Sequence, residues 1–181
     1  MEQYGFLFEM DKCVACKACE IACQKRNLSD QGLRLRTVTS LVKGAFPNVS
    51  VTNMSMSCQQ CGKPLCAAVC PTGAISKRLE DGIVVVDEAK CIGCFACLSA
   101  CPFNVPQFRD NGTMVKCDLC LDRKEMGLEP ACVQSCFYDA LHAGPLSELH
   151  ARAREKLTEK LAGHPSHQFS PRSNGGPGRQ S

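Results

Sequence analysis

The feature that most constrains this chain is its supply of cysteine, which makes up 16 of its 181 residues. The cysteines fall into four groups of four, and none is left over. Group I is Cys13, Cys16, Cys19 and Cys23; group II is Cys58, Cys61, Cys66 and Cys70; group III is Cys91, Cys94, Cys97 and Cys101; group IV is Cys117, Cys120, Cys132 and Cys136. This internal repeat of a metal-binding motif dictates the architecture of the chain.

The spacing within the groups is typical of [4Fe–4S] clusters. Groups I and III read C-x2-C-x2-C-x3-C, and group II differs only by two extra residues before its third cysteine. A cubane cluster needs one thiolate at each of four iron corners, and a looping backbone with x2 spacing can supply three of them. Group IV, C-x2-C-x11-C-x3-C, would by itself also suit zinc. Its x3 ending and the company of the other groups favour iron–sulfur there too.

Other uses of so much cysteine find less support. A disulfide scaffold belongs to secreted chains, and residues 1–8 lack the basic region, the long apolar region and the cleavage site of a secretory signal. No apolar run reaches the length of a membrane span. The formal charge of +3 gives little support to a nucleic-acid partner, because four clusters of roughly −2 each would change it to about −5.

The pairing rule of two-cluster ferredoxins predicts which cysteines share a cluster. In those proteins the fourth cysteine of each run ligates the other cluster. Residues 58–102 therefore read as one two-cluster ferredoxin, and groups I and IV should pair by the same rule. We predict cluster A on Cys13, Cys16, Cys19 and Cys136; cluster B on Cys117, Cys120, Cys132 and Cys23; cluster C on Cys58, Cys61, Cys66 and Cys101; and cluster D on Cys91, Cys94, Cys97 and Cys70.

The predicted fold class is α+β, with two bacterial-ferredoxin-like modules, one inserted in the other, small hairpins and a C-terminal helix. Residues 1–35 and 111–145 would form the two halves of the split module, and residues 58–110 the inserted one. Residues 36–57 are rich in β-branched side chains and should form a linking hairpin. A helix over 146–162 and a disordered or extended tail over 163–181 complete the chain.

Local signals place the smaller elements. The dipeptides Asp81-Gly82 and Asn111-Gly112 are typical of tight turns and predict hairpins over 74–87 and 106–116. We expect a strand over 4–10, a helix over 18–27, and further helices after the third cysteine of most groups. The apolar face of 146–161 suits packing on the chain's own domain or docking to a partner.

Charged and titratable residues outside the cysteine groups give weaker signals. The pairs Lys77-Arg78 and Arg123-Lys124 suit docking or cluster tuning as well as a solvated surface. The histidines lie outside the groups and are expected at the surface or in the tail; they are His142, His150, His164 and His167.

Three stretches carry a resemblance to a known family. QYGFLFEMDKCVACKACEIAC, SCQQCGKPLCAAVCPTGAISKRLEDGIVVVDEAKCIGCFACLSACPFNVPQF and KCDLCLDRKEMGLEPACVQSC resemble the four-cluster iron–sulfur subunits of molybdopterin oxidoreductases, of the anaerobic dimethyl sulfoxide reductase kind. The resemblance implies a double-ferredoxin fold, a molybdopterin catalytic subunit as partner, and a quinone-reactive membrane-anchor subunit. It also implies the order A–B–C–D, with A facing the catalytic subunit and D the membrane.

Two positions bear on how far the resemblance extends. Some relatives carry tryptophan where this chain has Cys94 and assemble a three-iron cluster, so the cysteine predicts four cubanes here. Phe137 follows Cys136 where the family commonly has proline, which would alter the surroundings of cluster A but not its ligation.

The function expected from the sequence is electron relay through four [4Fe–4S] clusters between the membrane and catalytic subunits, without catalysis by this chain. The alternative is a free-standing soluble polyferredoxin shuttle, and a third reading is an enzyme with an open iron site. No Ser–His–Asp set, phosphate loop or dinucleotide fingerprint is present in the sequence. We expect synthesis in the cytoplasm and peripheral attachment to the membrane in a complex, on a face that the sequence leaves open.

Overall fold

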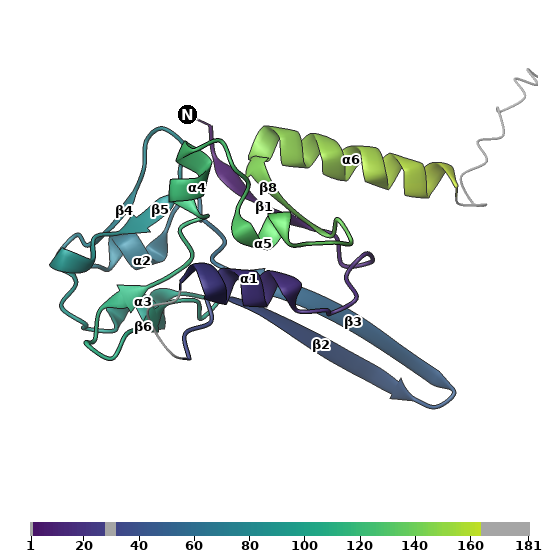
Figure 1. Ribbon diagram of the computed structural model, residues 1–181, viewed down its shortest axis with the longest axis horizontal. Coiled ribbons are helices and arrows are strands. Elements are labelled where there is room, and N and C mark those ends of the chain that lie inside the picture. The colour runs from purple at the N-terminus through teal and green to yellow at the C-terminus, as the bar shows by residue number, and fades with distance from the viewer. Residues whose placement is uncertain (1, 28–31, 164–181) are drawn as a thin grey trace, which may run out of the picture.

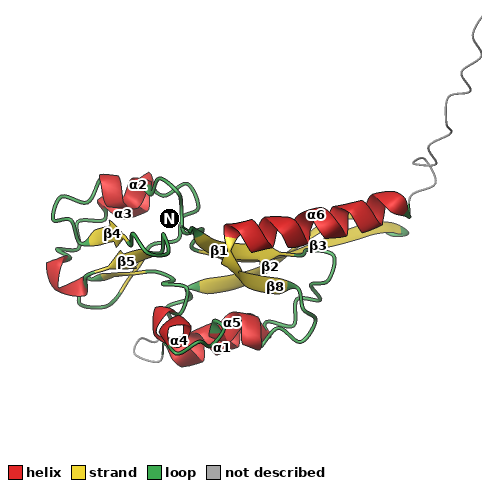
Figure 2. Ribbon diagram, turned by 90° about the horizontal axis from the view of Figure 1, so that it is seen from above, coloured by secondary structure: helices red, strands yellow, loops and turns green. Residues whose placement is uncertain are grey.

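The structure, a computed structural model, describes residues 2–27 and 32–163. Within them the strands form four two-stranded antiparallel sheets, accompanied by short helices and one long one (Figures 1 and 2). This mixture of strands and helices confirms the predicted α+β class. No helix in the described part of the chain is both long and apolar enough to cross a membrane.

One layered unit is built from the two ends of the described chain. Strand β1 (Tyr4–Phe8) pairs along its whole length with β8 (Leu141–Pro145). Helix α1 (Ala18–Arg26) packs against α5 (Ala131–Gln134) on one side of this sheet, and α6 (Leu146–Ala162) lies on the other (Figure 2).

A second unit comes from the middle of the chain. Strand β4 (Ile75–Lys77) pairs with β5 (Val84–Val86), and β6 (Gln107–Phe108) pairs with β7 (Met114–Val115). Helix α2 (Leu65–Ala68) packs against α3 (Ala96–Ala100), while the 3-10 helix η1 (Glu88–Lys90) and α4 (Leu121–Glu125) lie in the connections. Both predicted tight turns are confirmed, because Gly82 and Gly112 have the positive φ angles that favour glycine.

The helices that carry cysteines follow one rule. Helices α1, α2, α3 and α5 each begin one residue before the third cysteine of their group. The third cysteine therefore lies in the first turn. This confirms the expected start of the helix over 18–27, whereas the other helices were expected only after the third cysteine. The cause is the left-handed residue or proline just before each helix, which turns the loop directly into the helix axis.

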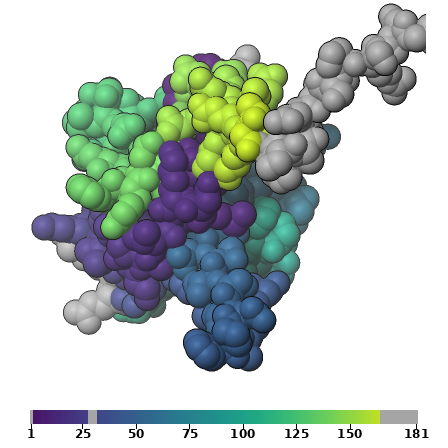
Figure 3. Space-filling model, turned by 90° about the vertical axis from the view of Figure 1, so that its right-hand side faces the viewer, coloured from purple at the N-terminus to yellow at the C-terminus, as the bar shows by residue number. Residues whose placement is uncertain are grey.

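The predicted linking hairpin is confirmed and is long. Strands β2 (Arg36–Ala45) and β3 (Asn48–Ser57) pair from Arg36↔Ser57 to Ala45↔Asn48. Only its base is buried, and the rest extends away from the cysteine-rich body (Figures 1 and 3). Phe46 at its tip is 94% exposed.

Helix α6 packs on its own domain over its first half only. Leu149 is buried, whereas Leu157 and Leu161 are 56% and 42% exposed. The sequence allowed this helix either to pack on its own domain or to dock to a partner, and packing on its own domain is confirmed for the first half. The predicted tail over 163–181 lies, apart from Gly163, outside the described residues.

The buried carboxylate of Glu9 fastens the second half of α6. It lies 3.1 Å from Lys12 Nζ and 3.3 Å from Arg152 Nε, and it accepts a short hydrogen bond from Lys156 Nζ. Burial alone would raise the pKa of Glu9, but hydrogen bonds from Lys156, Lys12 and Arg152 outweigh it and hold the pKa at about 2. Glu9 therefore favours the docked helix whenever it is ionised.

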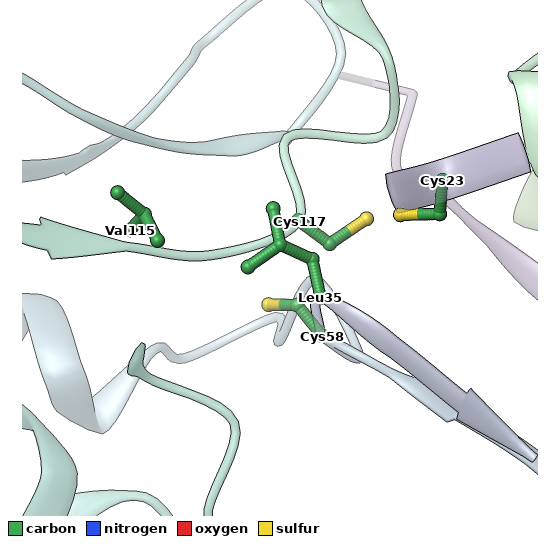
Figure 4. Close-up of a cluster of buried hydrophobic side chains, with 5 residues drawn as sticks. All are labelled: Cys23, Leu35, Cys58, Val115 and Cys117. Carbon is green, nitrogen blue, oxygen red and sulfur yellow. The ribbon is translucent and has the colours of Figure 1, made fainter. Parts of the chain in front are cut away.

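The apolar core is small and contains the cysteines themselves. One cluster consists of Leu35 and Val115 with Cys23, Cys58 and Cys117 (Figure 4). The other two clusters, with the side chains packed against them, also combine apolar residues with cysteines of all four groups. The interior of this chain is therefore also the place where its thiols meet.

Replacing Glu9 with glutamine should loosen α6 around Lys156. Hydrogen bonds to charged groups are worth about 1.5–3 kcal/mol, so amide exchange there should accelerate by about 10-fold or more. The folded pKa is lowered from 4.5, so the stabilisation is complete above that value and is lost as the pH falls through it towards about 2.

Hydrogen exchange compared at matched pH checks this. The difference in amide exchange rate between wild type and Glu9→Gln should be fully present at about pH 5.5 and should narrow below about 4.5. Glu155→Gln, on the exposed side of α6 and outside any ion pair in the described residues, is the matched control. A difference in exchange rate that does not change with pH would contradict the assignment of this stabilisation to the ionised Glu9.

Candidate metal centres

All sixteen cysteines lie in the described residues, and none is in a disulfide. Two sets each line a hollow of their own. One hollow is bordered by Val38 and Ser55 of the hairpin base and by four cysteines, Cys13, Cys16, Cys19 and Cys136. The other is bordered by Phe95, Phe108 and four more, Cys70, Cys91, Cys94 and Cys97.

The other eight cysteines form two further sets. Cys23 and Cys117 share a buried cluster, and α1, which carries Cys23, packs against α5, which carries Cys132. Burial first, and then neighbouring thiols, raise the pKa of Cys23 and Cys117; the neighbours are Cys132 and Cys120 for Cys23, and Cys132 and Cys23 for Cys117. In Figure 4 the sulfurs of Cys117 and Cys23 are turned toward each other, while that of Cys58 points away. In the last set, burial first, and then the nearby thiols of Cys58 and Cys101, raise the pKa of both Cys61 and Cys66.

These four sets have the membership predicted for clusters A, B, C and D. Their ligation of four clusters stays a prediction at this point. Within residues 2–27 and 32–163, no three His, Cys, Asp or Glu side chains gather closely enough to ligate a single metal ion.

The loops between the first and second cysteines share an unusual backbone conformation. The residue just before the second cysteine has a positive φ angle in every group: Ala15, Gln60, Gly93 and Leu119. Only Gly93 adopts it without strain, and each of the others costs about 1–2 kcal/mol. Successive amides in such a conformation point into one concavity that suits an anion, as in many iron–sulfur sites. The loops therefore fit a negatively charged cluster, although only the glycine is a signal that the sequence could reveal.

Hydrogen-bond donors already point at several sulfurs. The amides of Met114, Leu119 and Ala140 donate to the sulfurs of Cys91, Cys117 and Cys136 at 3.3, 3.4 and 3.3 Å. Asn27 Nδ2 lies 3.7 Å from the sulfur of Cys23, and the hydroxyls of Ser55 and Thr72 lie 3.6 Å from those of Cys19 and Cys70. Such donors stabilise thiolates and tune the potential of a bound cluster.

Burial keeps the innermost thiols protonated until metal replaces the proton. Burial, and then the charge of Cys132, raises the pKa of the Cys23 thiol to about 12. Burial raises the pKa of Cys117 further. Only a thiolate binds metal, so cluster insertion at these positions must release protons.

Polar side chains tie the loops together. Gln60 is buried, donates to the carbonyl oxygen of Cys117 at 2.8 Å and accepts from the amide of Val84 at 2.8 Å. Arg26 on α1 pairs with Asp118 at 3.0 Å and also with Asp122, which holds α1 against the group IV loop. These partners are far apart in sequence, and sequence reasoning missed them.

The flagged basic residues have structural contacts. Lys77 Nζ donates to the carbonyl oxygen of Gly62 at 2.7 Å, within the group II loop. Lys124 pairs with buried Asp81 at 3.0 Å. His142 lies 3.0 Å from Glu9, partly buried and outside the cysteine sets, whereas His164 and His167 lie outside the described residues.

Comparison with known proteins shows which family the chain belongs to. The model of the 4Fe-4S dicluster domain matches residues 49–146, more than half of the chain. This chain belongs to that family. It therefore holds [4Fe–4S] clusters in a ferredoxin-like domain, and its thiols, anion-binding loops and sulfur-directed donors fit that cofactor.

Relatives of known role extend the match beyond that domain. The chain is 42% identical over 159 residues to a chain of the anaerobic dimethyl sulfoxide reductase of Escherichia coli, covering 83% of this chain and 77% of that one. It is 40% identical to the thiosulfate reductase electron transfer subunit of Salmonella typhi (81% and 78%). It is 37% identical to a subunit of the tetrathionate reductase of Salmonella typhimurium (86% and 63%). The chain is thus a member of the iron–sulfur electron-transfer subunits of reductase complexes.

Gly93 gives a test of the loop geometry. Its φ is +65°, and a Cβ there would come within 2.7 Å of the carbonyl oxygen of Gly112. Gly73 has nearly the same φ, +64°, but nothing within 4 Å. Gly93→Ala should therefore lower the iron content of the purified protein, whereas Gly73→Ala, which adds only about 1–2 kcal/mol of backbone strain, should stay near wild type. Equal iron content in the two variants would show that this close approach does not shape the site.

Proposed function

We propose that this chain relays electrons through four [4Fe–4S] clusters between a quinone-reactive membrane-anchor subunit and a molybdopterin catalytic subunit, without being a catalyst itself. The similarity to component chains of three reductases, one of them named as an electron transfer subunit, supports a place in such a complex. Those relatives are named for dimethyl sulfoxide, thiosulfate and tetrathionate, so we propose an oxidised sulfur compound as the terminal acceptor.

The observation that carries the proposal is the way short helices join neighbouring sets of cysteines. Helix α1 carries Cys19 of set A and Cys23 of set B, four residues apart. Four residues of helix rise about 6 Å. Helix α3 carries Cys97 of set D and ends at Ala100, directly before Cys101 of set C. Sets A and B are therefore neighbours, and so are sets C and D.

The two pairs of sets meet in the core. Cys23 and Cys117 of set B lie in one buried cluster with Cys58 of set C, packed around Leu35 and Val115 (Figure 4). The order of sites is thus A–B–C–D. Electron transfer weakens steeply with distance, so a relay needs this kind of unbroken succession.

Solvent exposure of the cysteines distinguishes the outer sets, A and D, from the inner set B. Cys16 of set A and Cys94 of set D are exposed, whereas every cysteine of set B is buried. The outer sites are therefore the ones that a partner's redox group could approach. By family likeness we assign A to the catalytic subunit and D to the membrane anchor.

The chain's own residues hold the sites and set their energies. Bound clusters take up and release single electrons. The thiolates fix their places, the left-handed loops direct amides toward them, and burial excludes water. The nested arrangement of two modules is part of the proposal, and pairing of β1 with β8 and packing of α1 on α5 support it.

Iron and acid-labile sulfide per chain, with redox-titrated EPR on anaerobically purified protein, test the cluster count. Four cubanes require roughly sixteen of each. Few irons together with stoichiometric zinc would contradict electron transfer and leave a structural metal scaffold.

Double replacements test the pairing of cysteines. Cys13 and Cys23 belong to one sequence group but to different proposed clusters, whereas Cys23 and Cys117 belong to different groups but to one cluster. The Cys13→Ala/Cys23→Ala protein should lose two EPR-visible cubanes, and Cys23→Ala/Cys117→Ala only one. The opposite result would mean that each group ligates its own cluster.

Purification from membranes under mild detergent tests the partners. A relay subunit should remain peripheral to the membrane and co-purify with a large molybdenum-containing subunit and a membrane subunit. A protein that carries its clusters but purifies alone would instead be a soluble polyferredoxin. The face of the membrane is then found by protease protection of vesicles of known orientation.

A further inference from the structure

Arg36, at the base of the long hairpin, is a buried cation without a carboxylate. Its side chain is 2% exposed. Nη1 donates to Ser55 Oγ at 3.0 Å, Nη2 donates to Ser57 Oγ at 2.8 Å, and the guanidinium lies 4.5 Å from the centre of the Phe6 ring. Its Nε is buried without a hydrogen-bond partner. No ion pair found among the described residues includes Arg36.

Such a charge requires an anion. Burying an uncompensated guanidinium costs several kcal/mol, and neither two hydroxyls nor an aromatic ring removes that cost. The Phe6 ring beside the guanidinium packs against the buried cluster that holds Cys23 and Cys117 of set B and against the cluster next to Cys19 of set A. Burial raises the pKa of these three thiols, and the charge of Arg36 offsets part of that rise. A [4Fe–4S] centre with four thiolates carries a charge of roughly −2. Bound clusters at sets A and B would therefore supply the missing negative charge.

Ser55 connects this cation to one sulfur in particular. Its oxygen accepts a hydrogen bond from Arg36 and lies 3.6 Å from the sulfur of Cys19. Because the oxygen already accepts from the guanidinium, the hydroxyl proton is free to donate to the sulfur, and the neighbouring charge strengthens that donation. Ser57 bonds the same guanidinium but has no contact with a cysteine sulfur in the described structure. Of the two serines, only Ser55 therefore connects the guanidinium to a cysteine sulfur.

We propose that Arg36 is a positioning residue that serves as the shared counter-cation of sites A and B, and that the Arg36–Ser55 pair raises the reduction potential of site A. The inference rests on the proposed four-cluster function. Reduction adds negative charge, so a fixed cation and a hydrogen bond to sulfur stabilise the reduced state more than the oxidised one. Site C has a different buried cation, Lys116, whose charge offsets part of the rise that burial gives to the pKa of Cys61 and Cys66. Tuning by Arg36 should therefore be confined to one half of the relay.

Redox-titrated EPR of the four clusters tests this with four variants. Arg36→Gln removes the charge and keeps an amide donor, and it should lower two of the four midpoint potentials. Arg36→Lys keeps the charge and should restore both toward wild type. Ser55→Ala should lower only one potential, and that one should belong to the pair lowered by Arg36→Gln. Ser57→Ala, the matched control, should shift that same midpoint potential less than Ser55→Ala does.

Iron content distinguishes the possible failures. If the wild-type protein lacks four cubanes, the proposed function fails before the variants are read. Where the wild-type protein carries four clusters, the decisive variant is Ser55→Ala with its full iron content. If all of its midpoint potentials equal those of wild type, the inference is wrong, whether or not Arg36→Gln binds its clusters. Arg36 would then be a purely structural cation. Potentials unchanged in loaded Arg36→Gln, or shifted equally at all four clusters, would also overturn it.

Discussion

The structure depends on buried thiols that must lose their protons together. Each buried core cluster combines apolar side chains with cysteines, and burial raises the pKa of most of those cysteines whose pKa shifts. Few purely apolar side chains separate one set from the next. Metal that replaces the protons therefore supplies both the cofactor and much of the folding free energy, as in other small metal-dependent domains. Cluster insertion and folding should behave as one process in this chain.

Much of the fold was predictable from local signals. The Asp81-Gly82 and Asn111-Gly112 turns placed two hairpins correctly because a positive φ angle needs glycine or a small polar residue. The β-branched run over 36–57 was correctly predicted as a hairpin. The apolar spacing of 146–161 placed α6, but it could not show that only the first half buries its leucine side chain while the second half is held by ion pairs. Packing depends on where β1 and β8 end, and they come from opposite ends of the chain.

The cysteine sets were predicted from spacing alone, but the residues that support them were not. Arg36, Gln60 and Ser55 act on thiols or loops that are distant in sequence, and no spacing rule relates them. Ala15 and Leu119 hold a conformation that their side chains disfavour, so their identity hid their role. Glu9 and Lys156 meet only because α6 folds back over β1. Local patterns thus predicted the ligands, and only the tertiary structure shows what surrounds those cysteines.

Helix α1 separates two quantities that govern the speed of a relay. The gap between neighbouring sites is fixed by one turn of backbone, which a change of side chain scarcely alters. In the proposed relay, neighbours such as a serine hydroxyl or a buried guanidinium set the energy level at each site, and they can change one at a time. A protein of this design can therefore be adapted to terminal acceptors of different oxidising strength while its internal spacing stays the same. Such a separation of spacing from energy level is compatible with relatives that are named for three different sulfur compounds.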